Sequence, residues 1–477
     1  MTPMATMDVA VPPARQTGWD RVGVGRLTLL SLYWVAIGWL WNALGAQVLP
    51  PVITGMVGQA HQGTALSLLE SFGTLVAVVW QPVVGAVSDR TRLAWGRRRP
   101  YIAAGATGSS LFLVLMAFVG PYFWLLALYY FLLQVSSNTA QSPYQGLGPD
   151  AVPEKEFAKF SAFYGMGNLV GTLIGFLVTG IFTGAGAYNL AFFTMAAVLL
   201  LAMVMTVTLV PDRGRPDATL QHGLAEVTVG TFRISPRRHG AFLWLLGSRL
   251  LILMGIVGLE TYAQFFFKDV FYPGSSTTLT DHANSATTDL LAIIVVLAIA
   301  VSYPAARLSD RWGRKPMVVA CALLGAVGAL GLVFSHYTIL PHAMTAPLAS
   351  ILHIPGGLAQ VLWFGVPIGI GIGAFLTVDW AYMIDLIPAA EVGRFLGFSN
   401  IATAGSGIIA RLIAGPILDH FNAGRHILGE LGGYPVVFGM FVVYFVAGIV
   451  LVLPVPNRRG QPRASAATET QPSRSAP

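Results

Sequence analysis

The chain has 477 residues, of which 55% are hydrophobic and 10% are charged, whereas a soluble domain carries about 25% charged residues. This composition excludes an ordinary soluble domain, and the single cysteine, Cys321, excludes a disulfide framework and a thiolate metal site. The net charge of +7 does not indicate nucleic-acid binding, because the basic residues lie in short clusters between apolar runs.

In chain order, the apolar runs predict twelve membrane-spanning helices, each long enough for a hydrocarbon layer of about 30 Å. Their expected ranges are 27–49, 64–87, 102–119, 123–146, 160–183, 188–210, 241–267, 286–306, 317–336, 358–386, 397–418 and 433–453. Residues 1–26 lack a signal-peptide pattern, so we expect a cytoplasmic N-terminal tail. The interrupted segment 335–355 is expected to form an external loop.

A polar stretch at 211–240 divides the predicted helices into two halves. We therefore expect an all-α membrane protein with two six-helix bundles, at 27–210 and 241–453, joined by a central cytoplasmic loop. The C-terminal tail, 454–477, is rich in Arg, Ser, Ala, Thr and Pro and is expected to be disordered.

An internal repeat supports this division. The run Ser88-Asp89-Arg90 with Gly96-Arg97-Arg98-Arg99-Pro100 returns as Ser309-Asp310-Arg311 with Gly313-Arg314-Lys315-Pro316, after the second helix of each half. Asp150 and Asp385, which follow the fourth helix of each half, form a second repeated pair.

The basic residues predict the orientation of the chain. Only Lys268 and Arg425 lie on one side and Arg249 and Arg411 lie within spans, which leaves 24 of the 28 basic residues on the other side. Because basic loops stay in the cytoplasm, both termini are expected there.

Four ionisable residues fall well inside the spans: Arg249, Glu260, Asp379 and Arg411. A charge at bilayer depth costs about 2.5–3.5 kcal/mol on insertion scales, so such residues indicate substrate binding or proton coupling. The alternative is a structural role in ion pairs between helices. Asp379 and Arg249 fall at one depth, and Glu260 and Arg411 at another, so two ion pairs are possible. Glu70 lies near the outer end of the second helix and is expected to reach the outer interface, with a functional role as the alternative.

Polar uncharged residues form a second pattern. Gln134, Asn138 and Gln141 are spaced four and three apart and so share one helical face, and Asn42 lies beside Trp41. Amides donate and accept hydrogen bonds, and aromatic rings cover apolar faces, which is the combination that a sugar site needs. The alternative is hydrogen bonding that holds the bundle together. Further candidates for substrate contact are Glu260, Gln264, Asp379 and Trp380.

The repeated loop clusters resemble the loop motif of the major facilitator superfamily of transporters. The stretches from Gln81 to Ile102 and from Gln134 to Pro143 are further similar to sucrose-proton symporters and the wider glycoside-pentoside-hexuronide group. The resemblance implies a cavity lined by the first, fourth, seventh and tenth helices, and transport by alternating access between the two bundles.

The loop residues are expected to gate this motion, because an Asp beside an Arg at a helix end can hold the end of a bundle in one state. The expected gating residues are Asp89, Arg90, Arg97, Arg98, Asp150, Asp310, Arg311, Arg314 and Asp385.

Two residues depart from the plant-type pattern. Gln134 stands where those symporters carry the carboxylate implicated in proton coupling, and Gln145 stands at a family arginine. Because a glutamine cannot titrate, any proton coupling is expected to fall on Asp379 first and Glu260 second. A relative from a bacterial cytoplasmic (inner) membrane fits these departures better than a plant-type symporter.

The sequence therefore predicts a monomeric secondary or facilitative transporter for a small sugar, such as a glycoside, sucrose or maltose, with protons as a candidate coupling ion. The rivals are a carrier of another organic solute, such as a drug-proton antiporter, and a membrane sugar sensor that does not transport. No catalytic motif, cofactor motif or metal-ligand spacing is visible, so we expect no enzyme, cofactor or metal, and the lipid bilayer rather than nucleic acid is the expected partner.

Overall fold

The computed structural model of the chain describes residues 22–91, 93–153, 156–212, 240–274, 276–352, 354–386 and 392–457. The predicted terminal tails and central loop lie almost wholly outside these residues, so their boundaries stay predictions.

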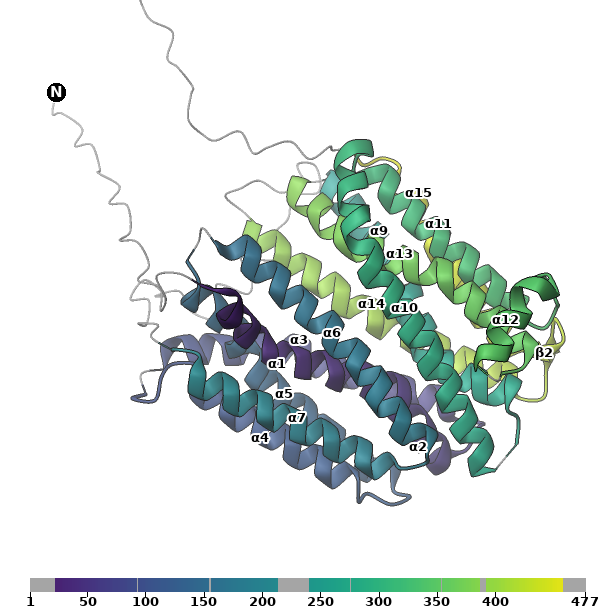
Figure 1. The fold of residues 1–477 in the computed structure, drawn as a ribbon, viewed down its shortest axis with the longest axis horizontal. Helices are drawn as coiled ribbons and strands as arrows, with labels where there is room; N and C mark the ends of the chain where they lie inside the picture. Colours follow the sequence, from purple (N-terminus) through teal and green to yellow (C-terminus); the bar gives the residue numbers. More distant parts are fainter. Residues whose placement is uncertain are drawn as a thin grey trace, which may run out of the picture.

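Helices make up nearly all of the described chain (Figure 1). Before the central loop these are α1 (Val24–Ala43), the π-helical turn η1 (Leu44–Val48), α2 (Leu49–Val57), α3 (Gln62–Arg90), α4 (Arg99–Met116), α5 (Phe123–Ala151), α6 (Phe157–Gly184) and α7 (Tyr188–Leu209). After it come α9 (Gly240–Phe266), the π-helical turn η3 (Phe267–Phe271), α10 (Thr277–Trp312), α11 (Arg314–Val333), α12 (His342–Leu352), α13 (Gly356–Leu386), α14 (Val392–Asn422) and α15 (Gly433–Val452). A short antiparallel pair, β1 (His426–Ile427) and β2 (Glu430–Leu431), precedes α15 and pairs His426 with Leu431.

Each predicted span corresponds to one long helix of the described chain. Within the described residues, nine helices are long and apolar enough to cross a membrane by length and composition, and α4, α5 and α14 are the long helices outside that set. The first span is longer than expected, because η1 joins α1 to α2 in one run over 24–57. The prediction of a loop over 335–355 is wrong in part, since this segment contains α12.

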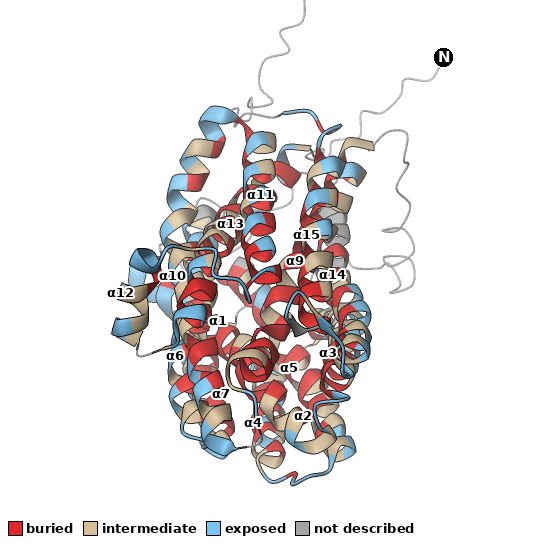
Figure 2. Cartoon of the chain, turned by 90° about the vertical axis from the view of Figure 1, so that its right-hand side faces the viewer, coloured by how far each residue is buried: buried red, intermediate tan, exposed pale blue. Residues whose placement is uncertain are grey.

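Apolar side chains cover the outside of the helices as well as the spaces between them. Figure 2 shows exposed residues along the outer faces and buried residues where helices meet. The exposed side chains include large apolar ones such as Phe72, Ile181 and Val443. Such a surface suits lipid, whereas in water it would favour aggregation.

The helices pack as two groups that lie side by side (Figure 1). We call α1 to α7 the first group and α9 to α15 the second group. Within the first group, α1 and α6 approach closely, because a side chain at Gly171 would meet the backbone of Val35. Small residues permit such close packing where lipid gives no hydrophobic drive for helix association. Between the groups, α3 packs against α14 and α6 packs against α10.

The two ends of the molecule differ in how the groups are joined. We call the side on which α7 and α15 end the terminal side, and the opposite side the distal side. The hydrogen bonds and ion pairs between the groups that the structure describes lie on the distal side and at the depth of Glu70. On the distal side Asp419 of α14 accepts from the backbone N–H groups of Gly63 and Thr64 at the start of α3, at 2.9 and 2.7 Å.

Candidate functional site

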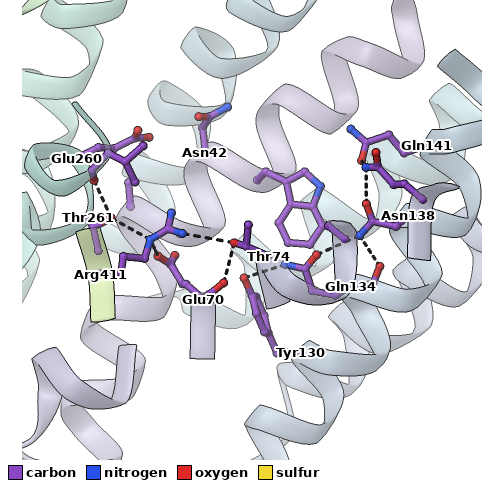
Figure 3. A pocket seen from close by; sticks show the side chains of 16 residues that line it. Asn42, Glu70, Thr74, Tyr130, Gln134, Asn138, Gln141, Glu260, Thr261 and Arg411 are labelled. Carbon is purple, nitrogen blue, oxygen red and sulfur yellow. Dashed lines mark hydrogen bonds and ion pairs between the residues drawn. The ribbon is translucent and has the colours of Figure 1, made fainter. Parts of the chain in front are cut away.

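A polar cavity of about 370 Å³ lies between the two groups (Figure 3). This volume is in the range of small-molecule sites, about 300–1,000 Å³. Helices α1, α3, α5, α9 and α14 and the turn η1 supply the lining residues: Trp41, Asn42, Gly45, Ala46, Glu70, Thr74, Ala77, Gln81, Tyr130, Gln134, Asn138, Gln141, Val257, Glu260, Thr261 and Arg411.

A chain of amides forms one wall of the cavity. Gln134 donates to the Tyr130 hydroxyl at 3.1 Å, and Asn138 donates to the Gln134 carbonyl at 2.7 Å. Gln81 of α3 donates to Asn138 Oδ1 at 2.6 Å and to Gln141 Oε1 at 3.2 Å. The predicted polar face of α5 therefore lines the cavity and also bonds to a neighbouring helix, so both interpretations of that face are present in the structure.

A charged cluster forms the opposite wall. Arg411 Nε lies 2.7 Å from Glu70 Oε2, and both side chains are largely buried. Arg411 also donates to Thr261 at 3.3 Å and to Thr74 at 3.4 Å. The prediction that Glu70 reaches the outer interface is wrong, because α3 packs against α14 and turns Glu70 towards Arg411. Glu260 lines the same cavity, and its carboxylate has no hydrogen-bond or ion-pair partner in the described part of the chain (Figure 3).

A smaller cavity of about 190 Å³ adjoins the first and shares Asn42 and Glu260 with it. Its remaining lining is mainly apolar, with Phe176 and Phe266 among the contributing side chains. Asn42 donates to Thr172 of α6 at 2.9 Å, which fixes its amide at the junction of the two cavities.

The predicted pair of Asp379 and Arg249 is present but lies elsewhere. The two side chains form an ion pair between α13 and α9, with side-chain exposures of 1% and 4%, and neither residue lines either cavity. The Arg249 guanidinium also lies 5.3 Å from the centre of the Trp380 ring. Gln264 donates to Asn284 at 3.1 Å and likewise lies outside both cavities. The second suggested pair is replaced, since Arg411 pairs with Glu70 rather than Glu260.

The repeated loop clusters form ion pairs on the terminal side. In the first group Asp150 accepts from Arg97 at 2.5 Å and from Arg98 at 2.6 Å, and Arg98 lies 3.1 Å from Asp89. In the second group Arg314 lies 2.7 Å from Asp310 and 3.1 Å from Asp385.

The remaining predicted gating residues lie beside these clusters. Arg90 and Arg311 are exposed at the ends of α3 and α10. The predicted contacts between the Asp and Arg residues are therefore present, and the gating role stays a prediction.

Sequence reasoning missed most of the α3 wall of the cavity. Glu70, Thr74, Ala77 and Gln81 are spaced four, three and four apart, which places them on one helical face. This spacing in an otherwise apolar helix is the signal that could have found them.

Comparisons with known proteins agree with this architecture. The chain is 24% identical over 497 residues to the sucrose transport protein SUC4 of Arabidopsis thaliana, which covers 92% of each chain. It resembles the structure of the nucleoside transporter NupG, with a TM-score of 0.65 and 14% identity over 90% of this chain and 98% of that one. It also resembles a D-xylose-proton symporter, with a TM-score of 0.64 and 16% identity over 90% of this chain and 97% of that one.

The sequence pattern that defines the Major Facilitator Superfamily matches residues 35–351 and 270–476, which together span most of the chain. With the two groups of helices and the cavity between them, this match gives the family: the chain belongs to the Major Facilitator Superfamily.

Proposed function

We propose that this chain is a secondary transporter that moves a small sugar across a membrane by alternating access. The observation that carries the proposal is the row of side-chain amides, from Gln81 to Gln141, on the wall of the cavity between the two groups of helices. Amides present a donor and an acceptor at each position, which matches the hydroxyl groups of a polyol. Trp41 adds an aromatic face beside them.

The names of the similar proteins support this substrate class. SUC4 is a sucrose transport protein, and one structural neighbour is a D-xylose-proton symporter. A drug antiporter fits less well, because Met and Phe are missing from the described lining of the larger cavity.

The terminal side is the proposed cytoplasmic side. The loop clusters with Arg97, Arg98 and Arg314 lie there, and basic residues concentrate in cytoplasmic loops. With its groups joined on the distal side, the structure then corresponds to a state closed to the outside. Gln134 and Gln145 keep a bacterial cytoplasmic membrane as the proposed location, because they replace the charged residues of the plant-type pattern.

The test is exchange of labelled sugars in vesicles that contain the purified protein, with a nucleoside and a cationic drug as competitors. We expect saturable exchange of a mono- or disaccharide that other sugars inhibit. Exchange inhibited only by the nucleoside or the drug would contradict the sugar assignment, and sugar binding without exchange would indicate a sensor.

A further inference from the structure

The charges in the larger cavity do not balance. Its described lining contains two carboxylates, Glu70 and Glu260, and one guanidinium, Arg411. The single positive charge of Arg411 balances one of the two negative charges, and in this structure Arg411 is paired with Glu70. A positive charge beside a carboxylate favours its charged form, so a carboxylate of this cavity binds a proton more readily once Arg411 leaves it.

The three residues are divided between the two groups in an informative way. Glu70 belongs to α3 of the first group, whereas Arg411 and Glu260 belong to α14 and α9 of the second group. Arg411 is also attached to its own group, because its Nε donates to Thr261, the residue next to Glu260. The ion pair to Glu70 is therefore a contact between groups, and the alternative partner lies within the group of Arg411.

Opening the distal side would separate α3 from α14. These helices are joined there by the bonds from Gly63 and Thr64 to Asp419, and deeper by the pair of Glu70 and Arg411. When they part, Arg411 loses Glu70 and retains Glu260 nearby. Glu70 then becomes the carboxylate without a positive partner, on the side that has just opened.

We propose that Arg411 exchanges its ion pair between Glu70 and Glu260 as the transporter alternates, and that a proton occupies whichever carboxylate Arg411 leaves. With the distal side open, Glu70 is protonated and Arg411 pairs with Glu260. On closing, Arg411 pairs with Glu70, and the proton that Glu70 releases binds Glu260. When Arg411 returns to Glu260, that proton leaves towards the terminal side, and Glu70 binds a new proton from the distal side. Arg411 stays protonated throughout, so the cavity keeps the same net charge. This inference rests on the proposed transport function and assigns its coupling site to Glu260 and Glu70 rather than Asp379.

The other groups that face the cluster do not supply a competing charge. From α5, Tyr130 lines the cavity and accepts from Gln134. From α9, the Tyr262 hydroxyl is bonded to Ser67 at 2.7 Å and donates to the Arg411 carbonyl at 3.2 Å. On α1 the lining residues are Trp41 and Asn42, which do not titrate.

The first test measures the distal opening directly and needs no knowledge of the sugar. Spin labels are placed at the exposed positions 61 and 423, with His61→Cys and Ala423→Cys in a Cys321→Ala background, and their distance distribution is measured in lipid. Glu260→Gln mimics protonated Glu260, leaves Arg411 on Glu70, and is expected to enrich the short distances. Glu70→Gln removes the ion pair between Glu70 and Arg411 and is expected to enrich the long distances.

Asp289→Asn provides a matched carboxylate-to-amide control, because Asp289 is half-buried on α10 and lines neither cavity. It is expected to leave the distance distribution as in the parent chain. Shifts of Glu70→Gln and Glu260→Gln in the same direction, or no shift in either, would overturn the exchange of partners.

The second test separates coupling from transport. Glu260→Gln is expected to bring labelled sugar only to equal concentrations inside and outside, whether or not a pH gradient is imposed, whereas Asp289→Asn accumulates sugar as the parent chain does. Accumulation at the parent level in Glu260→Gln would overturn the assignment. Failure of the parent chain itself to exchange any sugar would refute the proposed function instead, and the distances would still decide whether Arg411 changes partner.

Discussion

Carboxylates serve opposite purposes at the two ends of the molecule. On the terminal side Asp150 and Asp385 each bind arginines of their own group, which fixes the ends of helices within that group. On the distal side Asp269 and Asp419 belong to the second group but accept hydrogen bonds from Gln62 and Gly63 of the first group. Acidic residues at one end therefore stiffen each group, and at the other end they hold the two groups together.

The terminal clusters also differ from each other. Asp150 has a side-chain exposure of 18% and is bound by two arginines of 7% and 9% exposure, whereas Asp310 is 58% exposed and Asp385 is 30% exposed. The first group therefore contains the more deeply buried network. Substitutions in the cluster of the first group should therefore lower stability more than those in the cluster of the second group.

The largest effect is expected for Asp150→Ala. It removes the carboxylate shared by Arg97 and Arg98 and leaves two buried guanidinium groups with weaker neutralisation. We expect a loss of about 3 kcal/mol of stability, the lower end for breaking a buried ion pair. Thermal unfolding in detergent would measure it, and a loss below about 1 kcal/mol would show that this network resembles an exposed surface pair.

Substitutions in the cavity between the two ends should change sugar binding without changing the contacts at either end. Gln134→Ala or Asn138→Ala is expected to weaken sugar binding by about 1–3 kcal/mol, because each leaves a buried polar partner unmatched. Calorimetric titration of each variant is the measurement, with Ser137→Ala on the same helix as the control, since Ser137 does not line the cavity. Unchanged dissociation constants in both variants would move the sugar site away from α5.

The distal contacts should control opening rather than binding. Asp419→Asn retains one acceptor oxygen and loses the charge that faces the start of α3. We expect a cost of about 1 kcal/mol, the scale of a helix cap, and so roughly a fivefold shift towards the distally open state. Distance measurements with the labels at positions 61 and 423 would detect it. A shift towards the distally closed state would contradict the role of Asp419 in holding the two groups together.

The smallest effect on stability is expected for Asp89→Asn and Asp310→Asn, because their carboxylates are partly exposed. Each should lower stability by less than about 1 kcal/mol. Transport should nevertheless slow, with sugar affinity within a few fold of the parent chain, if these residues gate the terminal side. Binding in detergent and uptake in vesicles, measured on the same preparations, separate the two effects; lost binding with intact transport rates would reverse the assignment.

Local features of the site could be predicted from the sequence. The spacing of Gln134, Asn138 and Gln141 is a property of one helix, so their common face follows from helix geometry alone. Asp89 and Asp310 lie close in the chain to their arginine partners, and Asp150 and Asp385 lie at equivalent helix ends of the repeat, which made these contacts predictable.

Choices of partner between distant helices could not be predicted in the same way. Glu260 and Glu70 both line the cavity together with Arg411. Only the packing of α3 on α14 decides that Arg411 pairs with Glu70. Asp379 was expected to line the cavity because it lies in the tenth helix. The orientation of α13 about its own axis instead directs this side chain to Arg249 on α9, and no sequence pattern fixes that rotation.

The bond between Asp419 and the start of α3 has a consequence for how this protein tolerates change. The donors are backbone N–H groups, which every residue except proline carries, so substitutions at position 64 can vary the side chain and keep the hydrogen bond to Asp419. Substitutions at position 63 are more restricted, because a Cβ there would lie 2.8 Å from an Asp419 oxygen. At position 419 the acceptor is the side chain itself, so most substitutions remove the bond. A library of variants screened for increased opening of the distal side should therefore recover changes at 419 far more often than at 64, although both residues form the same bond.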